Sequence, residues 1–175
     1  RAARSQPDAA LRDFDRVLAL RPDDLDAHLA RLRVLAFDRT DRERTARAAD
    51  QAFPLASRDA RALAVLGRAC SYVGDVERAL RFHDIGIEVD AAYFDNWAER
   101  GLHRYRAERW AEALPDLQRA LELQLENRQY LFQAAAKCLV ALDRDDEAEA
   151  HFRKGVAAAP EDADLTRELA AFLVR

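Results

Sequence analysis

Residues 94–127 read FDNWAERGLHRYRAERWAEALPDLQRALELQLEN, and the pattern of this stretch recurs along most of the chain. Its slots return 34 residues earlier at Leu63, Leu66, Gly67, Gly74, Ala79, Gly86 and Val89. They return again 35 residues later at Phe132, Ala136, Ala148, Phe152, Gly155 and Pro160. Internal repetition at a period of about 34 residues is typical of helical repeat proteins, in which each repeat is one helix pair. The stretch therefore predicts an array of helix pairs.

The spacing of these slots resembles that of the tetratricopeptide repeat (TPR), which has Trp, Leu-Gly and Tyr in a first helix and Ala, Phe, Ala and Pro along a second. The slots that fit this pattern best are Leu63, Leu66, Gly67, Ala148, Phe152 and Pro160. The slots that depart from it are Arg100 in place of Leu, Arg104 and Cys70 in place of Tyr, and His83 in place of Phe. The resemblance covers nearly all 175 residues. It implies an all-α, right-handed α-solenoid of stacked antiparallel helix pairs.

The repeat pattern divides the chain, residues 1–175, into a single array of six parts. We expect a half repeat at 5–24, a degenerate repeat at 26–59, full repeats at 60–93, 94–127 and 129–162, and a capping or truncated helix at 163–175. The repeat at 26–59 is degenerate because its second helix, about 42–53, has an irregular end at Phe53-Pro54. In the repeat at 94–127, Pro115 falls inside the second helix, so we expect that helix to start late or to bend.

The amino-acid composition and net charge indicate which classes of protein the chain can belong to. Half of the residues are hydrophobic and only five are Gly and five Pro, which favours helices around a continuous core. The formal net charge of −4 argues against nucleic acid as a partner, because nucleic-acid binding needs a basic surface. No apolar run approaches the roughly 18 residues of a membrane span. We expect a cytoplasmic protein, although the absence of any Met, including an initiator, leaves a removed targeting segment open.

Candidate chemical motifs are lacking. None of the four histidines has a second His, a Cys or a suitable carboxylate at metal-ligand spacing. Each of the five glycines falls in a helix-packing or turn slot, so none is left for a phosphate-binding loop. Cys70 and Cys138 are expected to be buried thiols, which fits a reducing compartment. We therefore expect no catalytic residue, no metal site and no cofactor.

The resemblance implies a concave groove lined by the first helix of each repeat. The residues that it places in this groove as candidate binding residues are Arg31, Arg61, Arg68, Tyr72, Tyr105, Arg106, Tyr130 and Lys137. Its groove positions also include the apolar residues Val34, Phe37 and Val65. Five of the candidate binding residues are cationic, against the acidic groove residues Asp38, Asp95 and Glu99. Such a groove would attract an acidic peptide. The alternative is a solvated face of mixed charge, since 34% of the residues are charged. The slots of the chaperone-binding carboxylate clamp hold Ala30, Val34 and Val65, which argues against chaperone tails as ligands.

The sequence thus predicts a non-catalytic protein–protein interaction scaffold that binds a peptide or helical segment, acidic in character, in the concave groove. Two alternatives stay open. One is a regulatory or recruiting TPR module of a larger enzyme or assembly. The other is a self-associating, homo-oligomeric repeat domain that pairs through the terminal helix, with Leu165, Leu169 and Phe172 on its apolar face.

Overall fold

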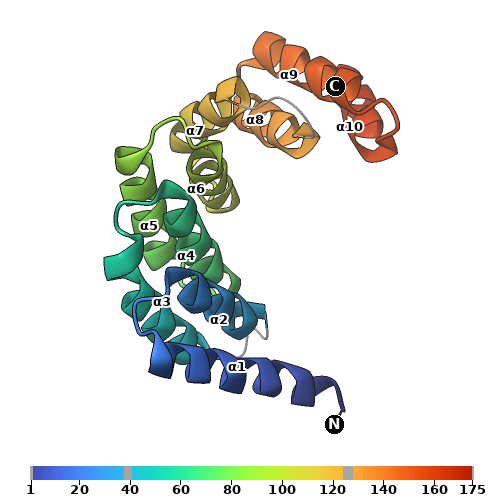
Figure 1. Ribbon diagram of the computed structural model, residues 1–175. Helices are drawn as coiled ribbons and strands as arrows, with labels where there is room; N and C mark the ends of the chain where they lie inside the picture. The colour runs from blue at the N-terminus through green and yellow to red at the C-terminus, as the bar shows by residue number, and fades with distance from the viewer. Residues whose placement is uncertain (1, 38–40, 124–127, 175) are drawn as a thin grey trace. The chain divides into compact units, whose positions relative to one another are not determined.

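The computed structural model describes residues 2–37, 41–123 and 128–174 (Figure 1). These described residues form ten α-helices and no strand. The helices are α1 (Ala2–Leu20), α2 (Leu25–Phe37), α3 (Arg42–Ala56), α4 (Ala60–Tyr72), α5 (Val76–Val89), α6 (Phe94–Arg106), α7 (Trp110–Leu123), α8 (Gln129–Ala141), α9 (Asp145–Ala158) and α10 (Ala163–Leu173). The all-α class expected from the repeat pattern is confirmed.

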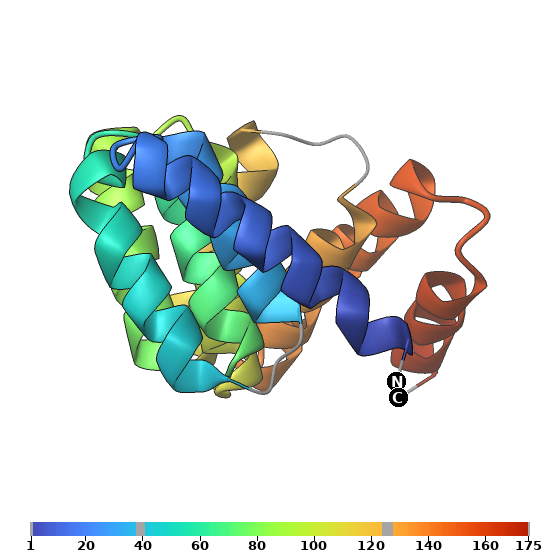
Figure 2. The ribbon, with the colours of Figure 1, turned by 60° about the horizontal axis from the view of Figure 1, so that its bottom comes forward.

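Contacts between helices divide the chain into two compact units, Arg1–Asn96 and Trp97–Arg175. In the first unit, α2 packs against α1, α3 and α4, and α4 also packs against α3 and α5 (Figures 1 and 2). In the second unit, α8 packs against α7 and α9, and α9 packs against α10. Consecutive helices therefore pair within each unit, as a helical repeat requires.

The repeat is visible in the backbone of the turns inside the helix pairs. Gly74, Glu108 and Asp143 have φ values of 77°, 58° and 56°, and they lie 34 and 35 positions apart. This left-handed conformation reverses the chain after a helix and is the one that glycine adopts most readily. Only the first of the three turns uses glycine. The period read from the side chains is thus repeated in the backbone conformation.

Aspartates begin several of the helices. The Asp59 carboxylate accepts hydrogen bonds from the backbone N–H groups of Arg61 and Ala62, at 2.9 and 3.1 Å, at the start of α4. The Asp24 carboxylate accepts one from Ala27 N–H at 2.9 Å at the start of α2. A helix leaves its first N–H groups without partners inside the helix, and an Asp cap satisfies them. Short aspartate-containing turns therefore fix where α2 and α4 begin.

Some helix ends differ from the expected ones, and each of these helices continues through a proline. The helix α1 already begins at Ala2, with Pro7 inside it. The helix α3 continues through Pro54 to Ala56, and the Ser57 hydroxyl donates to the Pro54 carbonyl at 3.1 Å. The helix α7 starts at Trp110 with Pro115 inside it, so it does not start late. A proline removes one backbone hydrogen bond, which a packed helix tolerates when its other bonds remain. The expected groove residue Asp38 and the repeat end at 124–127 lie outside the described residues.

A buried polar network in the first unit joins α4 and α5 to the first turn of α6. His83 of α5 and Asn96 of α6 are both 0% exposed. His83 Nδ1 lies 3.1 Å from Asn96 Oδ1, and Asn96 Nδ2 donates to the Ala60 carbonyl of α4 at 2.9 Å. A Cβ on Gly67 would lie 2.4 Å from the His83 ring, and one on Gly86 would lie 2.4 Å from the Asn96 side chain. The two glycines therefore make room for the histidine and the asparagine.

A buried ion-pair cluster joins α6 to α7 in the second unit. The Asp116 carboxylate is 2% exposed. It accepts hydrogen bonds from Arg100 Nε and Nη2 at 2.9 and 2.6 Å and from Arg104 Nη1 at 2.6 Å. The Arg100 guanidinium also lies 5.0 Å from the centre of the Trp97 ring. The two arginines that depart from the TPR pattern thus share one carboxylate partner.

Both cysteines are buried thiols, as the sequence predicts. Burial raises the pKa of Cys70 to about 12, with a further contribution from Asp75, and burial raises the pKa of Cys138 to about 11. A thiol reacts through its thiolate, so both are unreactive near neutral pH. Within the described part of the chain, no helix has the combined length and apolar character that crossing a bilayer requires.

Acid sensitivity of the second unit is expected from His103 in α6, which is 5% exposed. Burial, together with the nearby Arg106, lowers the pKa of His103 from 6.5 to about 4. Between these two values the unfolded chain takes up a proton that the folded chain does not, so stability falls as the pH drops through this window. Above pH 6.5 the residue has no such effect.

Urea unfolding at pH 7.5 and pH 5 measures this contribution. Between the two conditions, wild type should lose on the order of 2 kcal/mol more than His103→Gln, since each pKa unit corresponds to about 1.4 kcal/mol. His151→Gln replaces a half-buried histidine of the same unit and is the control. The same acid-induced loss in wild type and His103→Gln would show that His103 is not the group responsible.

Candidate functional site

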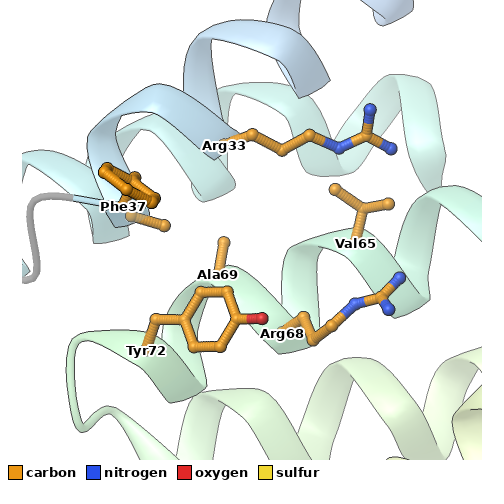
Figure 3. Close-up of a pocket in the computed structure, with 7 residues that line it drawn as sticks. Arg33, Phe37, Val65, Arg68, Ala69 and Tyr72 are labelled. Atoms are coloured by element: carbon orange, nitrogen blue, oxygen red, sulfur yellow. The ribbon is translucent and has the colours of Figure 1, made fainter. Parts of the chain in front are cut away.

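A pocket between α2 and α4 is the best candidate binding site in the first unit. It has a volume of about 690 Å³ and is lined by Arg33, Ala36, Phe37, Val65, Arg68, Ala69 and Tyr72. Figure 3 shows the α2 side chains on one side of the pocket and the α4 side chains on the other. The volume lies within the range of pockets that hold a ligand or several side chains of a partner.

The pocket has an aromatic end and a cationic end. The rings of Phe37 and Tyr72 lie at one end, with Ala69 near them, and the guanidinium groups of Arg33 and Arg68 lie at the other end, with Val65 beside them (Figure 3). Phe37 is 83% exposed and Tyr72 is 50% exposed. Exposed aromatic side chains beside an apolar floor are typical of surfaces that bind another molecule. The pocket thus offers apolar contact and positive charge side by side.

Helical spacing explains why these side chains share one face. Arg33 and Phe37 are four residues apart on α2 and therefore lie one turn apart on the same side of that helix. Val65, Ala69 and Tyr72 follow the same rule on α4. The small Ala36 and Ala69, which are 2% and 3% exposed, let the two helices come close and form the floor.

Arg68 already has an acidic neighbour in its own unit. Its guanidinium lies 4.0 Å from the carboxylate of Asp95, at the long limit of an ion pair. The Tyr93 hydroxyl donates to the same carboxylate at 3.1 Å. Burial and the nearby Asp95 carboxylate raise the pKa of Tyr93, which keeps this donor protonated. Asp95 is therefore held by Tyr93 and is within reach of Arg68.

The structure brings together only part of the predicted groove in the first unit. Arg68 and Tyr72 line the pocket. Arg31 instead donates from its Nε to the Asp15 carboxylate of α1 at 2.7 Å. Arg61 is an exposed side chain in the first turn of α4. Because the Arg31 guanidinium is already paired with Asp15, it attracts an acidic ligand less strongly than Arg33 and Arg68 do.

The other four predicted residues belong to the second unit. Tyr105 packs edge-on against Trp110, with ring centres 5.4 Å apart, and Arg106 is exposed at the end of α6. Tyr130 is 40% exposed in the first turn of α8. Lys137 donates to the Glu168 carboxylate of α10 at 2.8 Å, beside a smaller pocket of about 310 Å³. The positive charge of Lys137 is therefore matched by an acidic side chain of the same unit.

The terminal helix packs against its own unit through the residues suggested for self-association. Leu165 is 2% exposed, and the Phe172 ring lies 5.5 Å from the Phe152 ring of α9. Leu169 is half-buried against the same core. The strongly exposed apolar side chains at this end are Leu173 and Val174.

Arg33 is the main pocket residue that the sequence reasoning missed. The groove positions taken from the TPR resemblance include Val34 and Phe37 but not Arg33. Its spacing of four residues from Phe37 is the signal that could have found it, since it places both on one face of α2. Ala36 and Ala69 also line the pocket and are likewise not among the groove positions taken from the resemblance.

No group of three or more His, Cys, Asp or Glu side chains suited to a metal ion occurs among the described residues. The polar groups that converge on the α2–α4 pocket are two guanidiniums and one phenol. These groups can bind an anion, and none of them is a base or nucleophile at neutral pH.

Solved structures similar to this one are TPR proteins. A thermophilic TPR protein of Thermus thermophilus, TTC0263, superposes with a TM-score of 0.68 at 24% sequence identity, over 99% of this chain and 94% of that one. YrrB, described as a TPR protein with an unusual peptide-binding site, gives a TM-score of 0.74 at 15% identity, over 97% and 86% of the two chains. MamA gives 0.78 at 17% identity, over 93% and 94%.

Comparison of the amino-acid sequence with protein families and curated proteins finds no relative of the chain. No protein-family model matches the chain, and no curated protein matches it significantly. Identities below 25% establish the fold and leave the ligand open. The helix pairs, the period of the turns and the structural similarity all agree. The chain therefore has the tetratricopeptide-repeat fold, with antiparallel helix pairs in each unit.

Proposed function

We propose that the chain is a non-catalytic protein-interaction module that binds an acidic segment of a partner protein in the α2–α4 pocket. The observation that carries this proposal is the pair of guanidiniums, Arg33 and Arg68, beside an apolar floor with two exposed aromatic side chains. The net charge of −4 argues for a protein partner rather than a nucleic acid.

Both halves of the pocket contribute to such binding. Hydrogen bonds from a guanidinium to a carboxylate are charge-assisted, and each contributes about 1.5–3 kcal/mol when well formed. Aromatic and arginine side chains are also the residue types that dominate interface energetics. Phe37, Arg68 and Tyr72 line this pocket, and the TPR resemblance also places all three in the concave groove, which supports the pocket as the binding site. YrrB, with the same fold, has a peptide-binding site according to its description.

The proposal is tested with the double variant Arg33→Glu/Arg68→Glu. We expect the affinity for acidic peptides to fall at least tenfold, about 1.4 kcal/mol, because both donors become repulsive charges. Binding of a fluorescent pool of Glu- and Asp-rich peptides is measured by anisotropy. Wild-type affinity should also weaken between about 0.05 and 0.5 M salt, because salt screens these attractions.

Arg81→Glu is the matched control, since it reverses the charge of an exposed arginine on α5 of the same unit, outside the pocket. Circular dichroism establishes that both variants keep their helices. Equal affinity of wild type and the double variant would remove the binding site from the α2–α4 pocket. Wild-type binding that does not respond to salt would argue against the arginine–carboxylate mechanism.

A further inference from the structure

The lining of the α2–α4 pocket also indicates which backbone conformation its ligand has. We infer that the pocket receives an α-helix of the partner, which presents a large apolar side chain and, one helical turn away, an acidic side chain. The inference rests on the function proposed above and adds to it the form of the segment and the order of its residues.

Hydrogen-bond accounting favours a helix over an extended segment. Every backbone N–H that a ligand buries must find an acceptor, or it loses the hydrogen bond that it made with water. Among the described lining residues, Ala36, Phe37, Val65 and Ala69 have no polar side-chain atom, and the two arginines only donate. The Tyr72 hydroxyl is the one side-chain oxygen in this set. The lining residues all belong to α2 and α4, and the carbonyls of Arg33, Val65 and Arg68 bond within these helices. Carbonyls without a partner inside the helix occur in the last turns, at Ala36, Phe37, Ala69 and Tyr72, so an extended ligand would find few acceptors beside the arginines.

A helical ligand needs no acceptors from the pocket for its backbone, because its N–H groups bond to its own carbonyls. It meets the pocket only with side chains, and these are what the lining residues can bind. Extended ligands of other proteins add to sheet edges or meet side chains that accept from their N–H groups. The described lining of this pocket has no sheet edge, and Tyr72 is the one such acceptor among its side chains. An amphipathic helix in an apolar groove is the recognition mode that fits.

The positions of the aromatic and cationic side chains in the pocket determine how the apolar and acidic side chains of that helix are spaced. The aromatic side chains Phe37 and Tyr72 and the guanidinium groups of Arg33 and Arg68 lie at opposite ends of the pocket (Figure 3). Side chains at i and i+3 or i+4 of a helix lie next to each other on one face, about 5–6 Å apart at Cβ. An apolar side chain between Phe37 and Tyr72 therefore leaves an acidic side chain one turn away facing Arg33 and Arg68.

Asp95 sets how strongly such an acidic side chain can bind. Its carboxylate lies 4.0 Å from the Arg68 guanidinium, so a ligand carboxylate competes with it for that charge. The Tyr93 hydroxyl holds Asp95 in place at 3.1 Å. Replacing Asp95 by the neutral Asn removes the competing charge while keeping the shape of the side chain. Asp95→Asn is thus expected to bind the acidic helix more tightly than wild type does, by about threefold or more.

Three designed peptides, each about 16 residues long and based on alanine and glutamine, test the inference, and the first two have the same composition. The first has Phe at one position and Glu four residues later. The second has the Glu two residues after the Phe, on another face. The third keeps the first spacing but has two prolines that break the helix. We expect the first peptide to bind wild type at least fivefold more tightly than either of the others, measured by fluorescence anisotropy.

The outcomes separate this inference from the proposed function. If all three peptides bind equally and Arg33→Glu/Arg68→Glu weakens all of them, the pocket binds acidic segments but does not require a helix, and the inference is overturned. If none binds wild type and the acidic peptide pool does not bind either, both are overturned.

Two further results would also overturn the inference. One is an unchanged affinity of Asp95→Asn for the first peptide, with its helix content intact. The other is concentration-dependent dimerisation of wild type that Arg68→Glu abolishes, which would make a second copy of the chain the occupant.

Discussion

Asp116→Ala is expected to lower the free energy of unfolding of the second unit by about 3–5 kcal/mol, because it removes the buried carboxylate that two largely buried guanidiniums share. The Asp116 side chain is 3% exposed, and those of Arg100 and Arg104 are 14% and 20% exposed. Three hydrogen bonds from these arginines to α7 end on this one carboxylate, whereas the bond from Arg104 to the Glu112 carbonyl is long, at 3.5 Å. Removing one partner of such a cluster costs more than a surface ion pair, because the remaining charges cannot reach water freely.

Urea unfolding followed by tryptophan fluorescence measures this loss, since Trp97 and Trp110 both belong to the second unit. The matched control is Glu122→Ala, which removes the acidic partner of an exposed pair with Arg119 on the same helix. That change should cost under about 1 kcal/mol. A loss for Asp116→Ala as small as the control's would show that the cluster does not stabilise the packing of α6 on α7.

Asn96→Ala is expected to lower the stability of the first unit by about 2–4 kcal/mol. The change removes the hydrogen bonds to His83 and to the Ala60 carbonyl, at 3.1 and 2.9 Å, and opens a cavity where the amide was. Asn96 is 0% exposed, so water cannot easily replace the lost partner of His83. Urea unfolding followed by circular dichroism is the measurement.

Gly86 supplies a sharper test of the same packing. A Cβ at this position would lie 2.4 Å from Asn96 Nδ2, so Gly86→Ala should cost about 1–3 kcal/mol in wild type. In the Asn96→Ala background the same methyl group enters the vacated space, and its cost should largely disappear. An equal cost of Gly86→Ala in both backgrounds would contradict the close contact between Gly86 and Asn96.

The repeat slots explain how much of the fold the sequence could predict. Small and apolar residues recur at a period of about 34, and this periodicity is a local property of the chain that needs no coordinates. It predicts the helix pairs, and Gly74 marks one of the turns. Departures from the pattern were harder to interpret. His83 fills a Phe slot because Gly67 leaves room for the ring and Asn96 bonds to it, and that partner lies 13 residues further on.

The ion-pair cluster shows why partners across helices escape sequence reasoning. Asp116 is one of 32 acidic residues, and nothing local distinguishes it from the exposed ones. A usable signal did exist, because Arg100 and Arg104 lie four residues apart at two slots that usually hold Leu and Tyr. Two arginines on the inward face of a helix require a buried acidic partner opposite them. The identity of that partner depends on how α6 packs on α7.

The candidate site was predictable in part for the same reason. The TPR resemblance placed Arg68, Tyr72, Val65 and Phe37 on the groove face, and these residues line the α2–α4 pocket. It could not show that Arg31 is held by Asp15 or Lys137 by Glu168, since both pairs form between different helices. Their charges are therefore matched within the chain, and the cationic character of the pocket comes from Arg33 and Arg68.

The central claim is that the α2–α4 pocket is the surface through which this protein binds a partner. Its most direct test is a titration of the isotopically labelled chain with the helical Phe/Glu peptide, followed by amide and methyl chemical shifts. The account predicts that the largest shifts occur at Ala36, Val65 and Ala69, and that Arg33→Glu/Arg68→Glu abolishes them. Largest shifts on other helices, with these three residues unchanged at saturation, would contradict it.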